Sequence, residues 1–137
     1  MALITGSAYA GLSDRNGAPV ISGLLAGEAI KAAAPCYIGS DGEVYECTGV
    51  SGSASRVIGF AACQRDEGEP VSLYGAGALF QLGGTSMTVG SELFLSDTDA
   101  GYLEDGAAAG DKGAVALAIS TKDIIIVRAN GVHSTGA

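Results

Sequence analysis

Residues 36–47 decide the fold, and they read Cys36-Tyr37-Ile38-Gly39-Ser40-Asp41-Gly42-Glu43-Val44-Tyr45-Glu46-Cys47. At the centre, Asp41-Gly42 lies between residues that favour β-strands. Such a pair is a strong hairpin signal because both positions of a tight two-residue turn need a positive φ. We therefore predict a β-hairpin with one buried face. The predicted cross-strand pairs are Ser40 with Glu43, Ile38 with Tyr45, and Cys36 with Cys47, and the predicted buried residues are Cys36, Ile38, Tyr45 and Cys47.

The two hairpin cysteines raise the question of a disulfide. Directly opposed Cα atoms of an antiparallel pair lie about 4.5–5.5 Å apart, which is within disulfide range. The chain has three cysteines, Cys36, Cys47 and Cys63, so they cannot all be paired. We favour reduced thiols that serve as small core residues, and a bridge between Cys36 and Cys47 stays open at this point.

Short β-prone runs continue along the chain, each bounded by Gly, Pro, Asp or Ser. The 22 glycines indicate turns between short strands more than long helices. Only residues 24–34 have a helical composition, and there Gly27 weakens the prediction and Pro35 ends it. We expect a mainly β fold, a compact β-barrel, β-tulip-like or sandwich domain with at most one short helix. The further predicted strands are 56–63, 69–74, 78–82, 92–95, 113–119 and 123–128.

The two halves of the chain repeat a similar order of strand patterns. Residues 35–38, 57–61 and 71–73 are followed by 92–95, 115–119 and 124–126, with an offset of roughly 57 residues at the first hairpin. A duplicated strand unit within one domain would explain this order. Chance similarity in a chain rich in Ala and Gly is the alternative.

The chain has 137 residues and 13.5 kDa, the size of one domain. Residues 1–23 contain glycines and a polar turn but no sustained period of 2 or 3.6, so we expect an extended N-terminal arm. Residues 24–128 form the predicted β-rich domain. Residues 129–137 are small and polar apart from Val132, which is typical of a flexible tail.

Composition excludes several classes of function. Apolar residues make up 47% and charged residues 16%, which favours a globular fold over disorder. The net charge of −8 leaves no cluster of cations for a phosphate backbone, so nucleic acid is not an expected partner. No apolar run is long enough for a membrane span, and the start lacks the features of a signal peptide. We expect a protein made in the cytoplasm, with no membrane partner.

No pattern predicts catalysis, a metal or a cofactor. The single histidine, His133, lies near the chain end, where a general base would not be held in place. Cys63 follows an apolar run and is read as a packed strand residue. The acidic run 96–101 begins like a calcium loop, but Ala100 and the missing closing Glu break the pattern. The Gly-rich runs 75–78 and 83–86 match no phosphate-binding loop, and the acidic cluster 66–69 reads as a hairpin tip. We predict no enzyme.

The stretch from Leu25 to Leu82 resembles the capsid decoration, or cement, proteins of tailed bacteriophages. The second half is similar too, and the lambda head decoration protein has a looser version of the same order without it. About 100 of the 137 residues take part in the resemblance. The strings that carry it are Ala26-Gly27-Glu28-Ala29-Ile30, Ala34-Pro35-Cys36-Tyr37-Ile38, Asp41-Gly42-Glu43-Val44-Tyr45, Val57-Ile58-Gly59-Phe60-Ala61-Ala62, Gly68-Glu69-Pro70-Val71-Ser72-Leu73-Tyr74, Gly77-Ala78-Leu79-Phe80, Val89-Gly90-Ser91-Glu92-Leu93-Phe94-Leu95 and Ala114-Val115-Ala116-Leu117-Ala118-Ile119.

The resemblance implies a structural virion protein with no catalytic role. Such a protein binds the major capsid protein on the outer surface of the head as a homotrimer and stabilises the expanded shell. The N-terminal segment would reach onto the capsid. Within it we expect Leu3, Ile4, Tyr9 and Leu12 to contact the capsid, because apolar residues in a segment without a core need a partner. The alternative is that these residues pack on their own domain.

Two other functions stay open. One is another virion β-module, such as the base of a head fibre or a tail accessory protein. The other is a small binding module or enzyme of bacterial origin, such as a carbohydrate-binding module. The absence of Trp and the scarcity of aromatic residues argue against sugar binding. A cluster of Tyr9, Tyr74 and Tyr102 on one surface would favour it.

Overall fold

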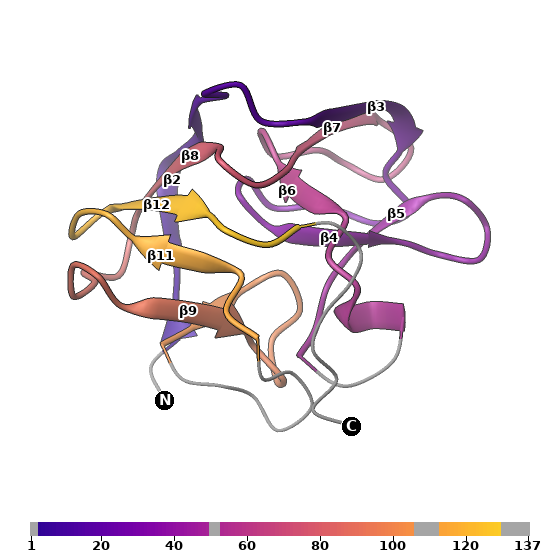
Figure 1. Ribbon diagram of the computed structural model, residues 1–137. Coiled ribbons are helices and arrows are strands. Elements are labelled where there is room, and N and C mark those ends of the chain that lie inside the picture. The colour runs from indigo at the N-terminus through magenta and orange to yellow at the C-terminus, as the bar shows by residue number, and fades with distance from the viewer. Residues whose placement is uncertain (1–2, 50–52, 106–112, 130–137) are drawn as a thin grey trace.

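The computed structural model describes residues 3–49, 53–105 and 113–129, except for the side chains of Ala8, Tyr9 and Ser53. Within these ranges the chain forms short β-strands, one 3-10 turn and no α-helix (Figure 1). The predicted mainly β, compact single domain is confirmed. The elements are β1 (Leu3–Ile4), β2 (Gly6–Asp14), β3 (Val20–Leu25), β4 (Pro35–Ile38), β5 (Val44–Glu46), η1 (Ser53–Ser55), β6 (Gly59–Ala61), β7 (Pro70–Tyr74), β8 (Leu79–Gly83), β9 (Glu92–Leu95), β10 (Leu103–Glu104), β11 (Ala116–Ala118) and β12 (Asp123–Ile126).

The strands form two antiparallel sheets. The smaller has the order β3-β7-β6-β4-β5, and the larger has the order β1-β10-β9-β11-β12-β8-β2. Figure 1 shows them side by side, with β8, β12, β11 and β9 stacked in one and β3, β7, β6 and β4 in the other. The larger sheet is nearly closed and barrel-like. Its terminal strand β2 meets the smaller sheet, where the Leu12 amide donates a hydrogen bond to the Ala62 carbonyl at 3.0 Å.

Both sheets contain the same five-stranded unit. The order β3-β7-β6-β4-β5, which we call the first unit, matches β8-β12-β11-β9-β10, the second unit, strand for strand. The register matches as well, because an offset of 57 residues converts the pair Cys36–Gly59 into the pair Leu93–Ala116. The similarity of the two halves therefore corresponds to a repeated unit with one pattern of strand pairing.

Strands β1 and β2 are the part of the larger sheet that the repeat does not supply. They lie beyond β10 and β8, so N-terminal residues cover both edges of the second unit. This differs from the predicted arm over residues 1–23 ahead of a domain that begins at residue 24. Residues 3–4, 6–14 and 20–25 are strands of the domain itself. The β2–β8 register shifts between Gly6 and Gly11, and that irregularity hides the alternation by which a strand is predicted.

Two apolar clusters hold the sheets. The larger joins them, with the rings of Phe60 on β6 and Phe80 on β8 tilted at a centroid distance of 6.0 Å. The smaller lies on the other face of β6, where Ala61 packs with Leu73 and Ile30. Successive residues of β6 therefore serve different cores, as expected for a strand buried on both faces.

The predicted hairpin forms, but its register differs from the prediction. The turn holds three residues, 40–42, closed by hydrogen bonds from the Gly42 amide to the Gly39 carbonyl and from the Gly39 amide to the Glu43 carbonyl. Gly42 has a φ of 82° whereas Asp41 has no positive φ, which is the pattern of a three-residue loop with a bulge. Asp-Gly suits both loop lengths, so the local sequence does not distinguish them. The observed pairs are Cys36 with Glu46, Tyr37 with Tyr45, and Ile38 with Val44.

The new register changes the buried face. Val44 and Cys36 are fully buried, whereas Ile38 is 39% exposed and Tyr45 is half-buried.

No disulfide joins any of the three cysteines, in agreement with the favoured interpretation. Burial raises the pKa of the Cys36 thiol well above its usual value. Cys63 is exposed, so its interpretation as a packed strand residue is wrong.

Residues 24–34 do not form the helix that their composition allowed. β3 continues to Leu25, and the following amides donate to other strands and loops instead of forming helical hydrogen bonds. Gly27 donates to Val44, and Ile30 donates to Arg65. A Cβ on Gly27 would lie 2.4 Å from the Tyr45 ring, so the segment needs glycine to lie flat on the hairpin.

Candidate functional site

The four residues predicted to contact a partner lie in different environments. Ile4 is 5% exposed and belongs to the larger core, and Leu12 is partly buried against that core. Leu3 is half-buried on β1, opposite Glu104. Tyr9 lies on β2, but its side chain is outside the described residues. The alternative that these residues pack on their own domain therefore describes Ile4 and Leu12, and Ile4 is not available to a partner.

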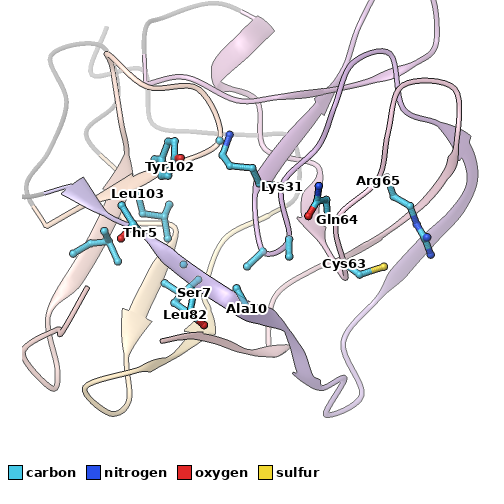
Figure 2. Close-up of a pocket in the computed structure, with 15 residues that line it drawn as sticks. Thr5, Ser7, Ala10, Lys31, Cys63, Gln64, Arg65, Leu82, Tyr102 and Leu103 are labelled. Carbon is cyan, nitrogen blue, oxygen red and sulfur yellow. The ribbon is translucent and has the colours of Figure 1, made fainter. Parts of the chain in front are cut away.

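A hollow of about 550 Å³ lies between the two units. N-terminal residues form one wall, and loops of both units form the others (Figure 2). We call it the inter-unit hollow. Its size is in the range of small-molecule sites, but its lining contains neither histidine nor a carboxylate. Its lining residues are Ile4, Thr5, Gly6, Ser7, Ala10, Lys31, Ala32, Ala33, Cys63, Gln64, Arg65, Leu82, Gly101, Tyr102 and Leu103.

Lys31 is one of the two cationic side chains that line this hollow, with Arg65. Its Nζ lies 2.8 Å from Oε1 of Glu46, donates to the Ala100 carbonyl at 3.1 Å, and sits 4.5 Å from the centroid of the Tyr102 ring. The Lys31 amide also donates to Oε2 of Glu46 at 2.8 Å. The Glu46 carboxylate, 8% exposed, is thus paired on both oxygens. These contacts join the first unit to the 100–102 loop of the second unit.

Gly101 makes this junction possible. A Cβ on Gly101 would lie 2.6 Å from the Glu46 carboxyl carbon, and the residue has a φ of 82°. Its amide donates to the Cys47 carbonyl. These contacts hold the 100–102 loop of the second unit against the first unit.

The remaining polar groups of the hollow do not form a reactive set. In Figure 2, Cys63 and Arg65 lie at the rim and point away from Tyr102, while Gln64 lies between them and Lys31. A cysteine nucleophile needs an adjacent base, and the lining offers none. His133, the only histidine, lies outside the described residues.

The acidic runs form turns in the structure. In 96–101, the Ser96 hydroxyl accepts hydrogen bonds from the amides of Thr98 and Asp99 and donates to Oε2 of Glu104. In 66–69, the Asp66 amide donates to Oε1 of Glu69 on an exposed hairpin tip. Across residues 3–49, 53–105 and 113–129, no group of three or more metal-ligating side chains gathers. In the same ranges, no helix is long and apolar enough to cross a membrane.

The Gly-rich runs serve turns and close approach. Gly77 has a φ of 99° in the turn before β8. A Cβ on Gly84 would lie 2.3 Å from the Thr5 carbonyl oxygen, so this glycine lets the N-terminal strand lie against the second unit.

Sequence reasoning missed a surface feature at the outer edge of β3. Val20 and Leu25 are 37% and 44% exposed there. A smaller hollow of about 240 Å³, which we call the β3 hollow, extends inward from β3 over β7 and the residue before β6. The sequence assigned these residues to an arm and to a possible helix, so neither the strand nor its edge was predicted. The lining residues of the β3 hollow are Pro19, Ile21, Ile58, Leu73, Gly75 and Ala129.

Comparison with known proteins adds no identification, since no family model matches the sequence and no curated protein is significantly similar to it.

Proposed function

We propose that this chain is a structural protein of a virus particle. Within that class, the function supported best is that of a capsid decoration protein, which binds the outer surface of a tailed-phage head through the major capsid protein and stabilises the expanded shell. The proposal includes assembly of the decoration protein as a homotrimer.

One observation carries this proposal. The strings that resemble decoration proteins fall on seven of the ten strands of the two repeated units, β4 to β9 and β11. The resemblance therefore covers strands of both sheets, and not only turns rich in Gly and Ala. Such a domain offers strand edges and turns, rather than a catalytic cleft, for attachment to a surface.

Of the four N-terminal residues expected to contact the capsid, we keep two in the proposal. Leu3 is half-buried on the outermost strand of the larger sheet, so it remains our proposed contact with the shell, together with Tyr9. Deleting residues 1–16 is not a clean test, because it would remove Ile4 from the core and uncover β8 and β10. The substitution Leu3→Lys is the better variant, with Val89→Lys, at a 60% exposed position, as its control.

Sugar binding gains no support from the tyrosines. Tyr102 lines the inter-unit hollow, whereas Tyr74 is partly buried against the larger core and does not line that hollow. The side chain of Tyr9 lies outside the described residues. The described tyrosines therefore do not form the cluster that this alternative needs.

The test is co-sedimentation of the purified protein with expanded, DNA-free heads of the source phage, titrated to saturation. Saturation near three copies per local threefold position is expected for a trimeric decoration protein. No binding to heads, by a protein whose circular dichroism shows a folded β structure, would overturn the proposal. Binding to isolated tails instead would favour a tail accessory protein.

A further inference from the structure

The outer edge of β3 differs from the other three edges of the two repeated units. In the second unit, β2 covers β8 and β1 covers β10. In the first unit, Ala26 forms a bridge with Val44 and so covers β5. Within the described residues, no strand or bridge lies beyond β3, which is the equivalent of β8. The repeat thus contains one strand position that the chain fills in the second unit and leaves open in the first.

The backbone of β3 is oriented to accept a strand. At its two ends, the Pro19 carbonyl accepts from the Gly75 amide and the Ala26 amide donates to the Glu69 carbonyl. Because hydrogen-bonding direction alternates along an antiparallel strand, the backbone groups of Val20 and Leu25 then point away from β7. Unpaired groups of this kind on an edge are a template for strand addition.

A bulge in β3 does not close this edge. The β3–β7 register shifts between Ile21 and Leu24, and Gly23 has a φ of 90° there. In the second unit the irregularity lies in the added strand instead: β2 has an extra residue between Leu12 and Asp14, and it still pairs with β8. The edge pairing of the second unit therefore forms although one of its two strands is irregular.

The side chains at this edge define the chemistry of the occupant. No charged residue occurs from Asn16 to Gly27, although the chain has a net charge of −8. The exposed side chains of Val20 and Leu25 present apolar surface. An uncharged extended segment complements this edge, whereas an acidic or basic segment would lose the hydration of its charges without gaining a partner.

A second copy of the chain is a poor occupant. Pairing of β3 with β3 of another copy would involve six residues on each side, far fewer than the roughly 20–30 residues per side of a stable interface. A strand contact of this size suits a partner that is already held at other points.

We propose that the outer edge of β3 binds an extended, uncharged segment of the shell protein by strand addition. This inference rests on the proposed function, since it takes the shell as the partner. It adds a contact surface on the first unit, distinct from the N-terminal strands.

The test compares two double variants that change charge equally. Val20→Lys/Leu25→Lys places lysines on the β3 edge, a device by which natural edge strands resist pairing. Val89→Lys/Ile119→Lys is the matched control, because Val89 and Ile119 are 60% and 45% exposed and lie in the second unit. Each is titrated against expanded, DNA-free heads. We expect the β3 variant to lose at least about tenfold in apparent affinity, and the control to stay within about twofold.

Further results separate strand addition by the shell protein from a side-chain contact, from self-association and from failure of the proposed function. Hydrogen exchange of the peptide covering β3 should slow on heads for the wild-type protein, which a side-chain contact alone would not cause. Equal binding by the two double variants would overturn the inference while leaving the decoration function intact. Loss of self-association by the β3 variant, measured by light scattering, would also overturn it, in favour of a second copy as occupant. Failure of the wild-type protein to bind heads would instead overturn the proposed function, and with it the shell segment as the partner.

Discussion

Ala33 and Gly90, 57 residues apart, occupy the same turn of the two repeated units. Both have a positive φ, 64° for Ala33 and 88° for Gly90. The amides of Ala33 and Gly90 donate to the carbonyls of Ala61 and Ala118, which are again 57 residues apart. This turn needs a residue in the left-handed backbone conformation. The second unit has a glycine at that position, and the first unit has an alanine whose backbone is strained.

This equivalence predicts different changes in unfolding free energy when the two residues are exchanged. Gly90→Ala should lower the free energy of unfolding by about 1–2 kcal/mol, because no neighbour lies within 4 Å and only the left-handed strain is added. Ala33→Gly should stay within about 1 kcal/mol of the wild-type value, since relief of strain offsets the loss of a buried methyl group. Urea unfolding of both variants measures this. A large loss for Ala33→Gly would show that its turn is not strained.

Gly101 and Gly42 provide a matched pair for the junction between the units. Both have a φ of 82°, but a Cβ meets nothing within 4 Å at Gly42 and meets the Glu46 carboxylate at Gly101. Gly42→Ala should cost about 1–2 kcal/mol of unfolding free energy from strain alone. Gly101→Ala should cost at least about 2 kcal/mol more, because a buried carboxylate must move from its partners. Equal losses would contradict the tight contact described here.

Lys31 is expected to stabilise the fold by pairing with Glu46. Lys31→Met leaves the buried carboxylate without its ammonium partner and should lower the unfolding free energy by about 1–3 kcal/mol. This loss lies between those of exposed and of fully buried pairs, because the Lys31 side chain is 40% exposed. Lys122→Met, at an exposed position, should stay within about 0.5 kcal/mol. The double variant Lys31→Met/Glu46→Gln should recover part of the loss. Thermal and urea unfolding would test all three, and a neutral Lys31→Met would refute the assignment.

Tyr45 and Asp41 at the hairpin tip should titrate as a coupled pair. The hydrogen bond from the Tyr45 hydroxyl to Oδ2 of Asp41 raises the pKa of Tyr45 to about 12 and lowers the pKa of Asp41. The contribution of Tyr45 to stability is therefore full below pH 10, its ordinary pKa, and is lost as the pH rises toward 12. The contribution of Asp41 is present above its ordinary pKa of 3.8 and is lost on acidification.

The absorbance of tyrosinate measures this pair directly. Asp41→Asn should lower the pKa of Tyr45 from about 12 toward 10, the ordinary pKa of tyrosine. Glu43→Gln removes a neighbouring carboxylate that does not bind the Tyr45 hydroxyl, and its titration curve should change much less. Identical curves for the two variants would show that charge near the tip, and not the hydrogen bond, sets the pKa of Tyr45.

Thiol reactivity should separate the three cysteines. Cys63 is exposed, whereas Cys36 and Cys47 are buried, and the pKa of the Cys36 thiol is raised by burial. A thiol reagent should therefore modify one cysteine per native chain and three in denaturant. One reactive thiol in denaturant without reductant would mean that Cys36 and Cys47 had formed a bridge.

The sequence by itself determined the fold class, the position of most strands and the repeat. These features depend on local signals, such as runs of β-prone residues bounded by Gly and Pro, which act over a few residues. It did not fix the hairpin register, because Gly42 suits both turn lengths and the packing of Val44 against Ala26 selects one. It also did not reveal β2, whose irregular pairing with β8 lacks a clear alternation.

The candidate surfaces were decided only by tertiary structure. Whether Ile4 contacts a partner or the core depends on which strands β1 meets, and pairing between segments about 100 residues apart leaves no local signal. The open edge of β3 is likewise a property of the whole sheet, since an edge exists only where no other strand has been placed. The sequence determined the short strands and turns, whereas long-range pairing determined which of their faces and edges stay available for binding.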